Sequence, residues 1–153
     1  MEPKFIPKEE YKKILELMPI PCVDLIIIHN KKILLVKRKD EPGKDWWWIP
    51  GGRIFKNETL EQAAIRKAKE ETGLDIRVEK KLTSYEFFYS KSTFGELKSG
   101  GHTISVVFLC KPINPNQEII LDNTSKDFKW IDEIEEDFHP ILKSFLKESK
   151  IFN

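Results

Sequence analysis

The sequence has few cysteines, no long apolar run and almost no net charge. Only two of the 153 residues are cysteine. Cys22 and Cys110 both lie in apolar, strand-like runs, which indicates reduced core thiols and argues against a disulfide framework. No run approaches the length of a membrane span, and the opening residues MEPKFIPKEE lack the apolar segment of a signal peptide. We therefore expect a cytoplasmic protein without a membrane partner.

The balance of charge argues against binding to nucleic acid or to an anionic membrane. The chain has 26 lysines and arginines against 25 aspartates and glutamates, which gives a formal net charge of +1. No basic field is available to attract nucleic acid or an anionic membrane. The length suits one domain, residues 1–153, that is large enough to bury a core.

A capped helix is predicted in the middle of the chain. Thr59 and Gln62 have the spacing of a capping box, and Gly73 stands where a left-handed residue ends a helix. The predicted helix has roughly three to four turns. Its helical periodicity places a carboxylate, Glu71, on the same half as several alanines.

A carboxylate on an apolar face needs a cationic partner, because burying an unpaired charge is costly. Two partners are possible for Glu71. One is the ammonium of Lys67, four residues earlier on the same helix. The other is a metal ion, since the preceding Pro50-Gly51-Gly52 segment would expose a backbone carbonyl, and oxygen ligands suit Mg²⁺ or Mn²⁺.

The spacing of residues 52–74 resembles the Nudix box of the Nudix hydrolases. The match begins at Gly52, and Glu58 follows after five residues and Arg66 after seven more. The pair Glu70 and Glu71 then follows after three residues, and Gly73 and Leu74 after one. Nudix enzymes split nucleoside diphosphates linked to another moiety, using Mg²⁺ or Mn²⁺. The resemblance implies an α/β fold, specifically an α/β/α sandwich around a mixed sheet.

The resemblance also implies roles within the box. The metal ligands would be the Gly51 carbonyl and Glu71, with Glu70 as a second carboxylate, and Arg66 would orient the carboxylates. One position departs from the family pattern, because Lys67 stands where the family has a glutamate. The exchange changes the local charge by two units, so we expect a single divalent ion.

Segments outside the box resemble one Nudix branch, the GDP-mannose mannosyl hydrolases. Enzymes of this branch attack carbon C1 of the sugar and release GDP. By this resemblance Asp24, Arg38 and Arg53 would bind substrate, with both arginines on the diphosphate, as would Tyr89 and His102. The alternatives are a backbone acceptor for Asp24, solvated surface charge for each arginine, and a strand-end residue in water for His102.

Three consecutive tryptophans, residues 46–48, precede the box. Successive strand side chains alternate between faces, so the three cannot all point one way. We expect at least one in the core and at least one, assigned here to Trp46, at the substrate site.

One departure from the branch leaves the chemistry open. The branch uses a Gln-His pair late in the chain as metal ligand and general base, whereas the matching positions here are Thr124 and Ser125. Our leading hypothesis is a Mg²⁺-dependent GDP-mannose hydrolase. The alternatives are a Nudix pyrophosphatase that attacks phosphorus in ADP-ribose or a nucleoside triphosphate, and a non-catalytic nucleotide-binding domain. Family likeness also predicts a homodimer.

The remaining elements are predicted from periodicity and turn residues. Residues 90–101 contain three glycines and are predicted to form a mobile loop over the substrate. Helices are expected at residues 8–18 and at 134–152, the latter interrupted near His139 and Pro140. Strands are expected at residues 23–29, 32–37, 75–78, 82–89, 103–110 and 128–131.

Overall fold

The structure is a computed structural model that describes residues 5–152. Its helices are α1 (Lys8–Leu17), α2 (Leu60–Thr72) and α3 (Pro140–Glu148). Its strands are β1 (Ile20–His29), β2 (Lys32–Arg38), β3 (Trp47–Trp48), β4 (Gly51–Arg53), β5 (Ile76–Ser92), β6 (Gly95–Pro112) and β7 (Ser125–Ile131).

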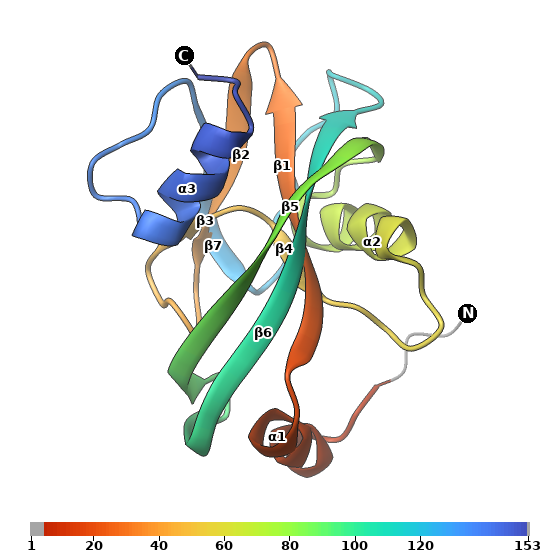
Figure 1. Ribbon diagram of the computed structural model, residues 1–153. Helices are drawn as coiled ribbons and strands as arrows, with labels where there is room; N and C mark the ends of the chain where they lie inside the picture. Colours follow the sequence, from red (N-terminus) through yellow and green to blue (C-terminus); the bar gives the residue numbers. More distant parts are fainter. Residues whose placement is uncertain (1–4, 153) are drawn as a thin grey trace.

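The strands form one mixed sheet with a helix on each face. Their order is β3-β2-β1-β6-β5, with β4 paired to β1 and β7 paired to β2. The β1 and β6 strands are parallel and the other pairs are antiparallel. Figure 1 shows α2 and α3 on opposite sides of this sheet, with α1 below it. The prediction of an α/β/α sandwich is therefore confirmed.

Two buried clusters explain why the helices pack on these faces. One joins the alanines of α2 to β1 and β6, and the other joins α3 to β2 and β3. The inner strand β1 is buried on both faces, so its Leu25-Ile26-Ile27 run is apolar throughout. The turn from β1 to β2 places Asn30 and Lys31 at φ 49° and 61°, the paired positive angles of a two-residue hairpin turn.

The central helix begins and ends where the sequence predicts. The Thr59 side chain accepts a hydrogen bond from the Gln62 backbone, and the Gln62 side chain accepts one from the Thr59 backbone. Gly73 ends the helix at φ 74°. Both ends of α2 are therefore capped, which satisfies part of the unpaired backbone groups there.

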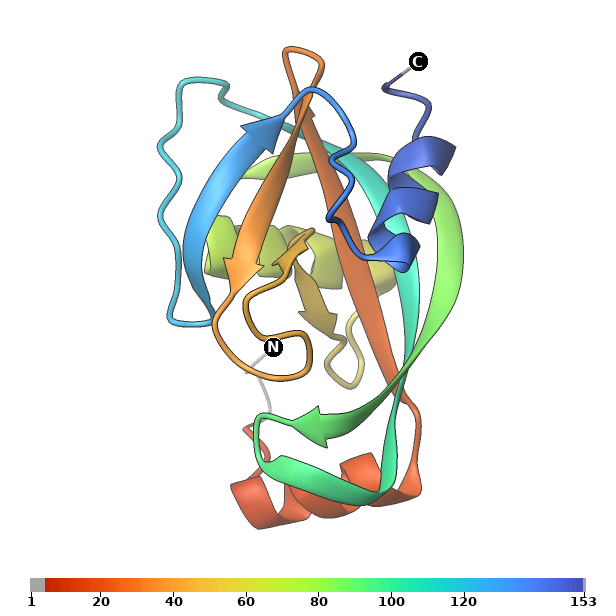
Figure 2. The same ribbon diagram turned by 90° about the vertical axis from the view of Figure 1, so that its left-hand side faces the viewer.

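The predicted mobile loop at residues 90–101 is wrong. Strands β5 and β6 stay paired up to Ser92 and Gly95, so this segment is the tip of a hairpin. Gly101 is needed for packing, because a Cβ there would lie 2.0 Å from the Tyr89 ring. Figure 2 shows the hairpin tip resting on α1, where Glu16 accepts hydrogen bonds from the backbone of Lys98 and Ser99 at 2.8 and 2.9 Å.

Two other predicted boundaries also differ from the structure. The strands expected at residues 75–78 and 82–89 are one strand, β5, because bulges absorb the irregular polar pattern between them. The last helix is only α3, and residues 134–139 are not helical. His139 begins α3 as its N-cap, with Nδ1 accepting from the Ile141 backbone at 3.2 Å, and Pro140 takes the first helical position.

The structure also bears on the two cysteines and on the search for a membrane-spanning helix. Cys22 and Cys110 are both free thiols. Within residues 5–152, no helix has the length and apolar character that a membrane crossing requires.

Candidate functional site

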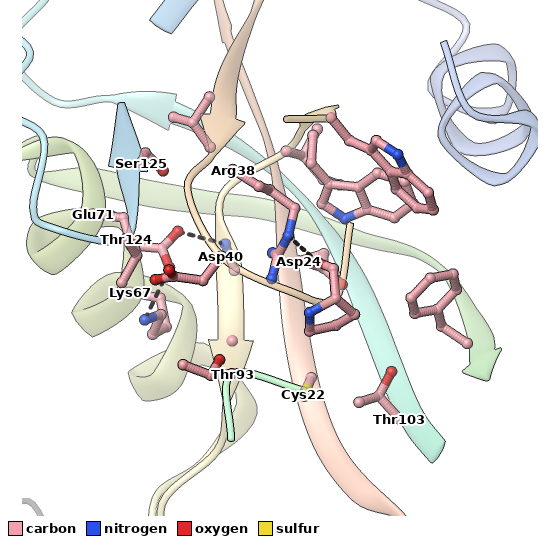
Figure 3. A pocket seen from close by; sticks show the side chains of 18 of the residues that line it. Cys22, Asp24, Arg38, Asp40, Lys67, Glu71, Thr93, Thr103, Thr124 and Ser125 are labelled. Carbon is pink, nitrogen blue, oxygen red and sulfur yellow. Dashed lines mark hydrogen bonds and ion pairs between the residues drawn. The ribbon is translucent and has the colours of Figure 1, made fainter. Parts of the chain in front are cut away.

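A pocket of about 400 Å³ opens between the hairpin, the end of β2 and the second half of α2. Figure 3 shows side chains from all of these elements facing the cavity. Six of the residues proposed from the sequence line it: Asp24, Arg38, Trp46, Gly51, Glu71 and, on the hairpin, Tyr89. Lys67, Thr124 and Ser125 line it as well.

One wall of the pocket is aromatic. Trp46 and Trp48 lie 6.1 Å apart, and Phe87 lies about as close to both. His139 stacks on Trp46 at 4.5 Å. Trp47 points the other way, 4.6 Å from the Lys129 ammonium. The predicted alternation of the three tryptophans is confirmed, and two of them form a surface on which a flat ring can stack.

A buried carboxylate, Asp24, forms part of the pocket floor. It lies in the middle of β1 and is 7% exposed. One oxygen, Oδ2, accepts hydrogen bonds from the Tyr85 hydroxyl at 2.5 Å and from the Ser105 hydroxyl. Burial raises the pKa of Asp24 to about 7, although both hydroxyls oppose the rise.

Sequence reasoning missed Tyr85 and Ser105. The available signal was the strand alternation, which places Tyr85 on the same face of β5 as Phe87 and Tyr89. Their meeting at Asp24 depends on the register that pairs Tyr85 with Ser105, and on the parallel pairing of β6 with β1. Hydrophobic pattern alone does not determine that register.

Arg38 supplies a fixed positive charge beside Trp46, since both side chains border the space that a Cβ at Gly43 would take. It ends β2, and its Nε donates to the Pro42 carbonyl at 2.5 Å. The loop after β2 therefore turns back on the guanidinium and holds it at the pocket. The neighbouring positions Thr124 and Ser125 provide hydroxyls but no ionisable base, as the sequence indicated.

The carboxylate of Glu71 is held between two donors. Its Oε2 accepts from the Gly51 backbone at 2.9 Å, and its Oε1 lies 3.1 Å from the Lys67 ammonium. Burial raises the pKa of Glu71, and the ammonium opposes that rise. Burial also disfavours charged Lys67, yet the attraction of Glu71 and Glu70 raises the pKa of Lys67 above its usual value. Of the two possible partners of Glu71, the Lys67 ammonium and a metal ion, the ammonium neutralises it in this structure.

Arg66 organises the other acidic residues of the helix. Its guanidinium makes two hydrogen bonds to the carboxylate of Glu58, at 2.6 and 2.9 Å. A third, at 3.2 Å, reaches Glu70, and a fourth reaches the Arg53 carbonyl. The hydrogen bonds to Glu58 lower the pKa of that carboxyl. Glu70, a proposed metal ligand, is not among the residues that line the pocket, and 43% of its side chain is exposed.

Two residues proposed to bind substrate do not line the pocket. Arg53 lies behind it, with its guanidinium stacked on Phe55 at 4.8 Å and on Tyr11 at 5.4 Å. His102 lies on the opposite face of the hairpin, stacked on Phe88 at 4.4 Å and 3.4 Å from Glu86. The strand period explains the error for His102, because the pocket-facing position is its neighbour Thr103.

The oxygen donors near Gly51 suit a divalent ion in their chemistry. Gly51 donates its N–H toward Glu71, and in a strand the carbonyl of the same residue points to the same edge. With Glu70 and Glu71 this gives a set of hard oxygen ligands of the kind Mg²⁺ and Mn²⁺ prefer. Within residues 5–152, however, no group of three acidic, histidine or cysteine side chains is arranged to hold a metal. The set therefore fits a metal only if the Lys67 ammonium leaves it.

Comparison with known proteins gives consistent results. A family model described as NUDIX domain matches residues 18–148. The Low-salt glycan biosynthesis protein Agl8 of Haloferax volcanii is 35% identical over 92% of this chain and 88% of its own length. The ADP-ribose pyrophosphatase of Methanocaldococcus jannaschii is 34% identical over 94% of this chain and 83% of its own length.

Solved structures show the same fold. A MutT NUDIX hydrolase from Burkholderia pseudomallei superposes with a TM-score of 0.68 at 23% identity, covering 86% of this chain and 98% of that one. A bifunctional NMN adenylyltransferase/ADP ribose pyrophosphatase from Francisella tularensis, complexed with AMP and a manganese ion, gives 0.58 at 33% identity. That similarity covers 85% of this chain and 42% of the longer protein.

Proposed function

The chain belongs to the Nudix family, and from that premise we propose that it hydrolyses nucleoside diphosphate sugars, with GDP-mannose as the leading substrate. The observation that carries the proposal is the composition of the pocket. The lining combines aromatic side chains around Trp46 with a polar part formed by Arg38 and the Gly51-Gly52 backbone. A nucleoside diphosphate sugar has the same division into a flat base, a charged diphosphate and a polar sugar.

Arg38 would bind the diphosphate. A guanidinium stays charged and presents paired donors that match phosphate oxygens. The hydrogen bond to Pro42 leaves its terminal nitrogens to meet the substrate. The base would stack on Trp46 or Tyr89, where aromatic rings already line the cavity.

Asp24 would hold the sugar. Its Oδ2 already accepts from Tyr85 and Ser105, so Oδ1 is the oxygen that can accept from a sugar hydroxyl. The same two hydroxyls fix the orientation of the carboxylate. Recognition of that sugar by a preset carboxylate favours substrates with a second sugar on the diphosphate over nucleotides whose only sugar is the ribose.

Nudix enzymes generally use divalent metals, and here Glu70, Glu71 and the Gly51 carbonyl would hold one Mg²⁺ or Mn²⁺. Such an ion, when bound, neutralises the charge on the phosphate oxygens. Arg66 would position Glu70, because it bridges that carboxylate to Glu58. In the leading reaction, the oxygen of water bonds to sugar C1, the bond from C1 to the phosphate oxygen breaks, and GDP leaves.

The second candidate is a pyrophosphatase that acts on ADP-ribose or a nucleoside triphosphate. It is favoured by the retained Glu70 and Glu71 pair and by the absence of a general base at Thr124 and Ser125. A relative that is 34% identical over most of the chain bears the name ADP-ribose pyrophosphatase. The two candidates share the pocket and differ in the atom that water attacks.

Hydrolysis in ¹⁸O-labelled water separates the candidates. GDP-mannose and ADP-ribose are incubated separately with the protein and Mg²⁺, and mass spectrometry identifies the products that carry the label. Label in free mannose, with unlabelled GDP, supports attack on C1. Label in a phosphate product supports the pyrophosphatase. Absence of metal-dependent turnover across a nucleotide panel would refute both and favour a binding-only domain.

The homodimer expected from family likeness also remains a proposal. Exposed apolar residues on both sides of α1, Phe5 before it and Leu17 and Met18 at its end, offer apolar surface for a second copy. Multi-angle light scattering should give twice the 18.0 kDa chain mass. A mass equal to one chain would refute the dimer.

A further inference from the structure

Lys67 places its ammonium group among the carboxylates proposed to bind metal. Its Nζ lies 3.1 Å from Glu71 and 3.4 Å from Glu70, and 13% of the side chain is exposed. Gly52 leaves room for it, because a Cβ at that position would lie 2.7 Å from the Lys67 Cε atom. The ammonium thus fills a space that the surrounding chain is shaped to provide.

Lys67 and a divalent ion compete for the same oxygen atoms. A carboxylate oxygen that is paired with an ammonium at about 3 Å has to exchange that partner before it can ligate a metal. The two cations would also repel each other at that separation. An ion held by Glu70 and Glu71 therefore requires Lys67 to move away from Glu71.

A bound substrate would give the displaced ammonium a place that favours a positive charge. Figure 3 shows Lys67 and Arg38 reaching the pocket from different elements, and both line it. A substrate diphosphate at Arg38 would bring anionic oxygens into this cavity. The lysine stem has four flexible carbons, so rotation moves its ammonium without moving the helix.

We propose that Lys67 is a second diphosphate-binding residue of this pocket and that its ion pair with Glu71 holds it back until a divalent ion takes its place. The inference rests on the proposed substrate class and metal ligands. Its consequence is that phosphate binding and metal binding support each other through one side chain. Such coupling is reciprocal, because each ligand removes Lys67 from the position that hinders the other.

The phosphate half of the proposal can be tested without any metal. GDP binding is measured by calorimetry in EDTA for the unaltered chain, Glu71→Gln, Lys67→Met and the double variant. Glu71→Gln removes the closer of the two ion pairs of Lys67 and leaves the longer one, to Glu70. The variant should therefore bind GDP about tenfold more tightly, the value of one charged hydrogen bond. The double variant should lose that gain, which shows that Lys67 carries it.

Two results would overturn the phosphate half. One is a Glu71→Gln variant that binds GDP no more tightly than the unaltered chain. The other is a gain that persists in the double variant, because it would then reflect only the loss of a negative charge. Circular dichroism melting confirms folding, and Lys67→Gln replaces Lys67→Met if the latter does not fold.

The metal half is tested by titrating Mn²⁺ without nucleotide and following free Mn²⁺ by electron paramagnetic resonance. Lys67→Met should bind Mn²⁺ about tenfold more tightly than the unaltered chain, because its carboxylates have lost their competing cation. Lys69→Met is the matched control, since Lys69 is an exposed lysine of the same helix that pairs with Asp75. Equal Mn²⁺ affinity in Lys67→Met and the unaltered chain would overturn the proposal.

These results are separate from the test of the proposed function. If Glu71→Gln binds GDP more tightly but the unaltered chain hydrolyses no nucleotide sugar, the proposed function is refuted and the role of Lys67 is retained. Hydrolysis of GDP-mannose, with no gain in the same variant, would refute the role of Lys67 alone.

Discussion

Replacing Asp24 by asparagine should make the protein more stable at alkaline pH relative to the unaltered chain. Asp24 is buried, and folding raises its pKa from 3.8 to about 7. A carboxyl whose pKa is higher in the folded state stabilises fully below its unfolded value. That contribution is lost as pH rises through the folded value. Asparagine cannot ionise, and its carbonyl can still accept from Tyr85 and Ser105.

The size of the effect follows from the shift in pKa. A rise of the Asp24 pKa from 3.8 to about 7 corresponds to about 4 kcal/mol of folding stability. The unaltered chain loses this stability as the pH rises across the same interval. Between pH 5 and pH 8 the lost part is about 2.5 kcal/mol. The stability of Asp24→Asn minus that of the unaltered chain should therefore rise by about 2.5 kcal/mol between pH 5 and pH 8.

Urea unfolding in EDTA, followed by tryptophan fluorescence at both pH values, measures this difference. Any packing change that does not depend on pH cancels in the comparison. Asp132→Asn is the control, because 70% of the Asp132 side chain is exposed beside Lys32, so its difference should stay near zero. If the stability difference between Asp24→Asn and the unaltered chain is also the same at pH 5 and pH 8, Asp24 is not a buried carboxyl that titrates in this range.

Three further predictions concern the N-caps of α2 and α3 and the proposed metal site. Thr59→Ala should lower the free energy of unfolding by about 1 kcal/mol, because it removes the α2 cap, and an unchanged urea midpoint would contradict this. Glu71→Gln should weaken Mn²⁺ binding by about 100-fold or more, since it removes a charged ligand. An unaltered Mn²⁺ titration would remove Glu71 from the site. Burial lowers the pKa of His139, so stability should fall as pH drops below about 6.5. His139→Asn should weaken that dependence while keeping the α3 cap, and equal pH profiles would contradict it.

Local features of the sequence predicted the elements whose causes are local. The capping box at Thr59 and the stop at Gly73 depend on residues within one helix, so spacing alone located α2. The alternation that separates Trp47 from its two neighbours is likewise a property of three consecutive residues. Such predictions need no knowledge of which strands meet.

Features that depend on strand register were missed or misplaced. The three glycines at residues 95, 100 and 101 indicated a loop, yet Gly101 makes room for Tyr89 within a paired strand. His102 was expected at the substrate by family resemblance, but a one-residue difference along a strand moves a side chain to the opposite face. The partners of Asp24 come from β5 and β6, far along the chain, and the sequence contains no short-range signal for them.

The hairpin changes what substrate binding has to involve. With residues 90–101 as a loop, closure over the substrate would have been the natural source of selectivity. The paired strands and the hydrogen bonds from Lys98 and Ser99 to Glu16 instead give the pocket a preformed wall. A preformed wall leaves side chains to respond to the substrate. Lys67 is the charged one whose present partner would have to change when metal binds, so the response should appear as coupling between metal and diphosphate.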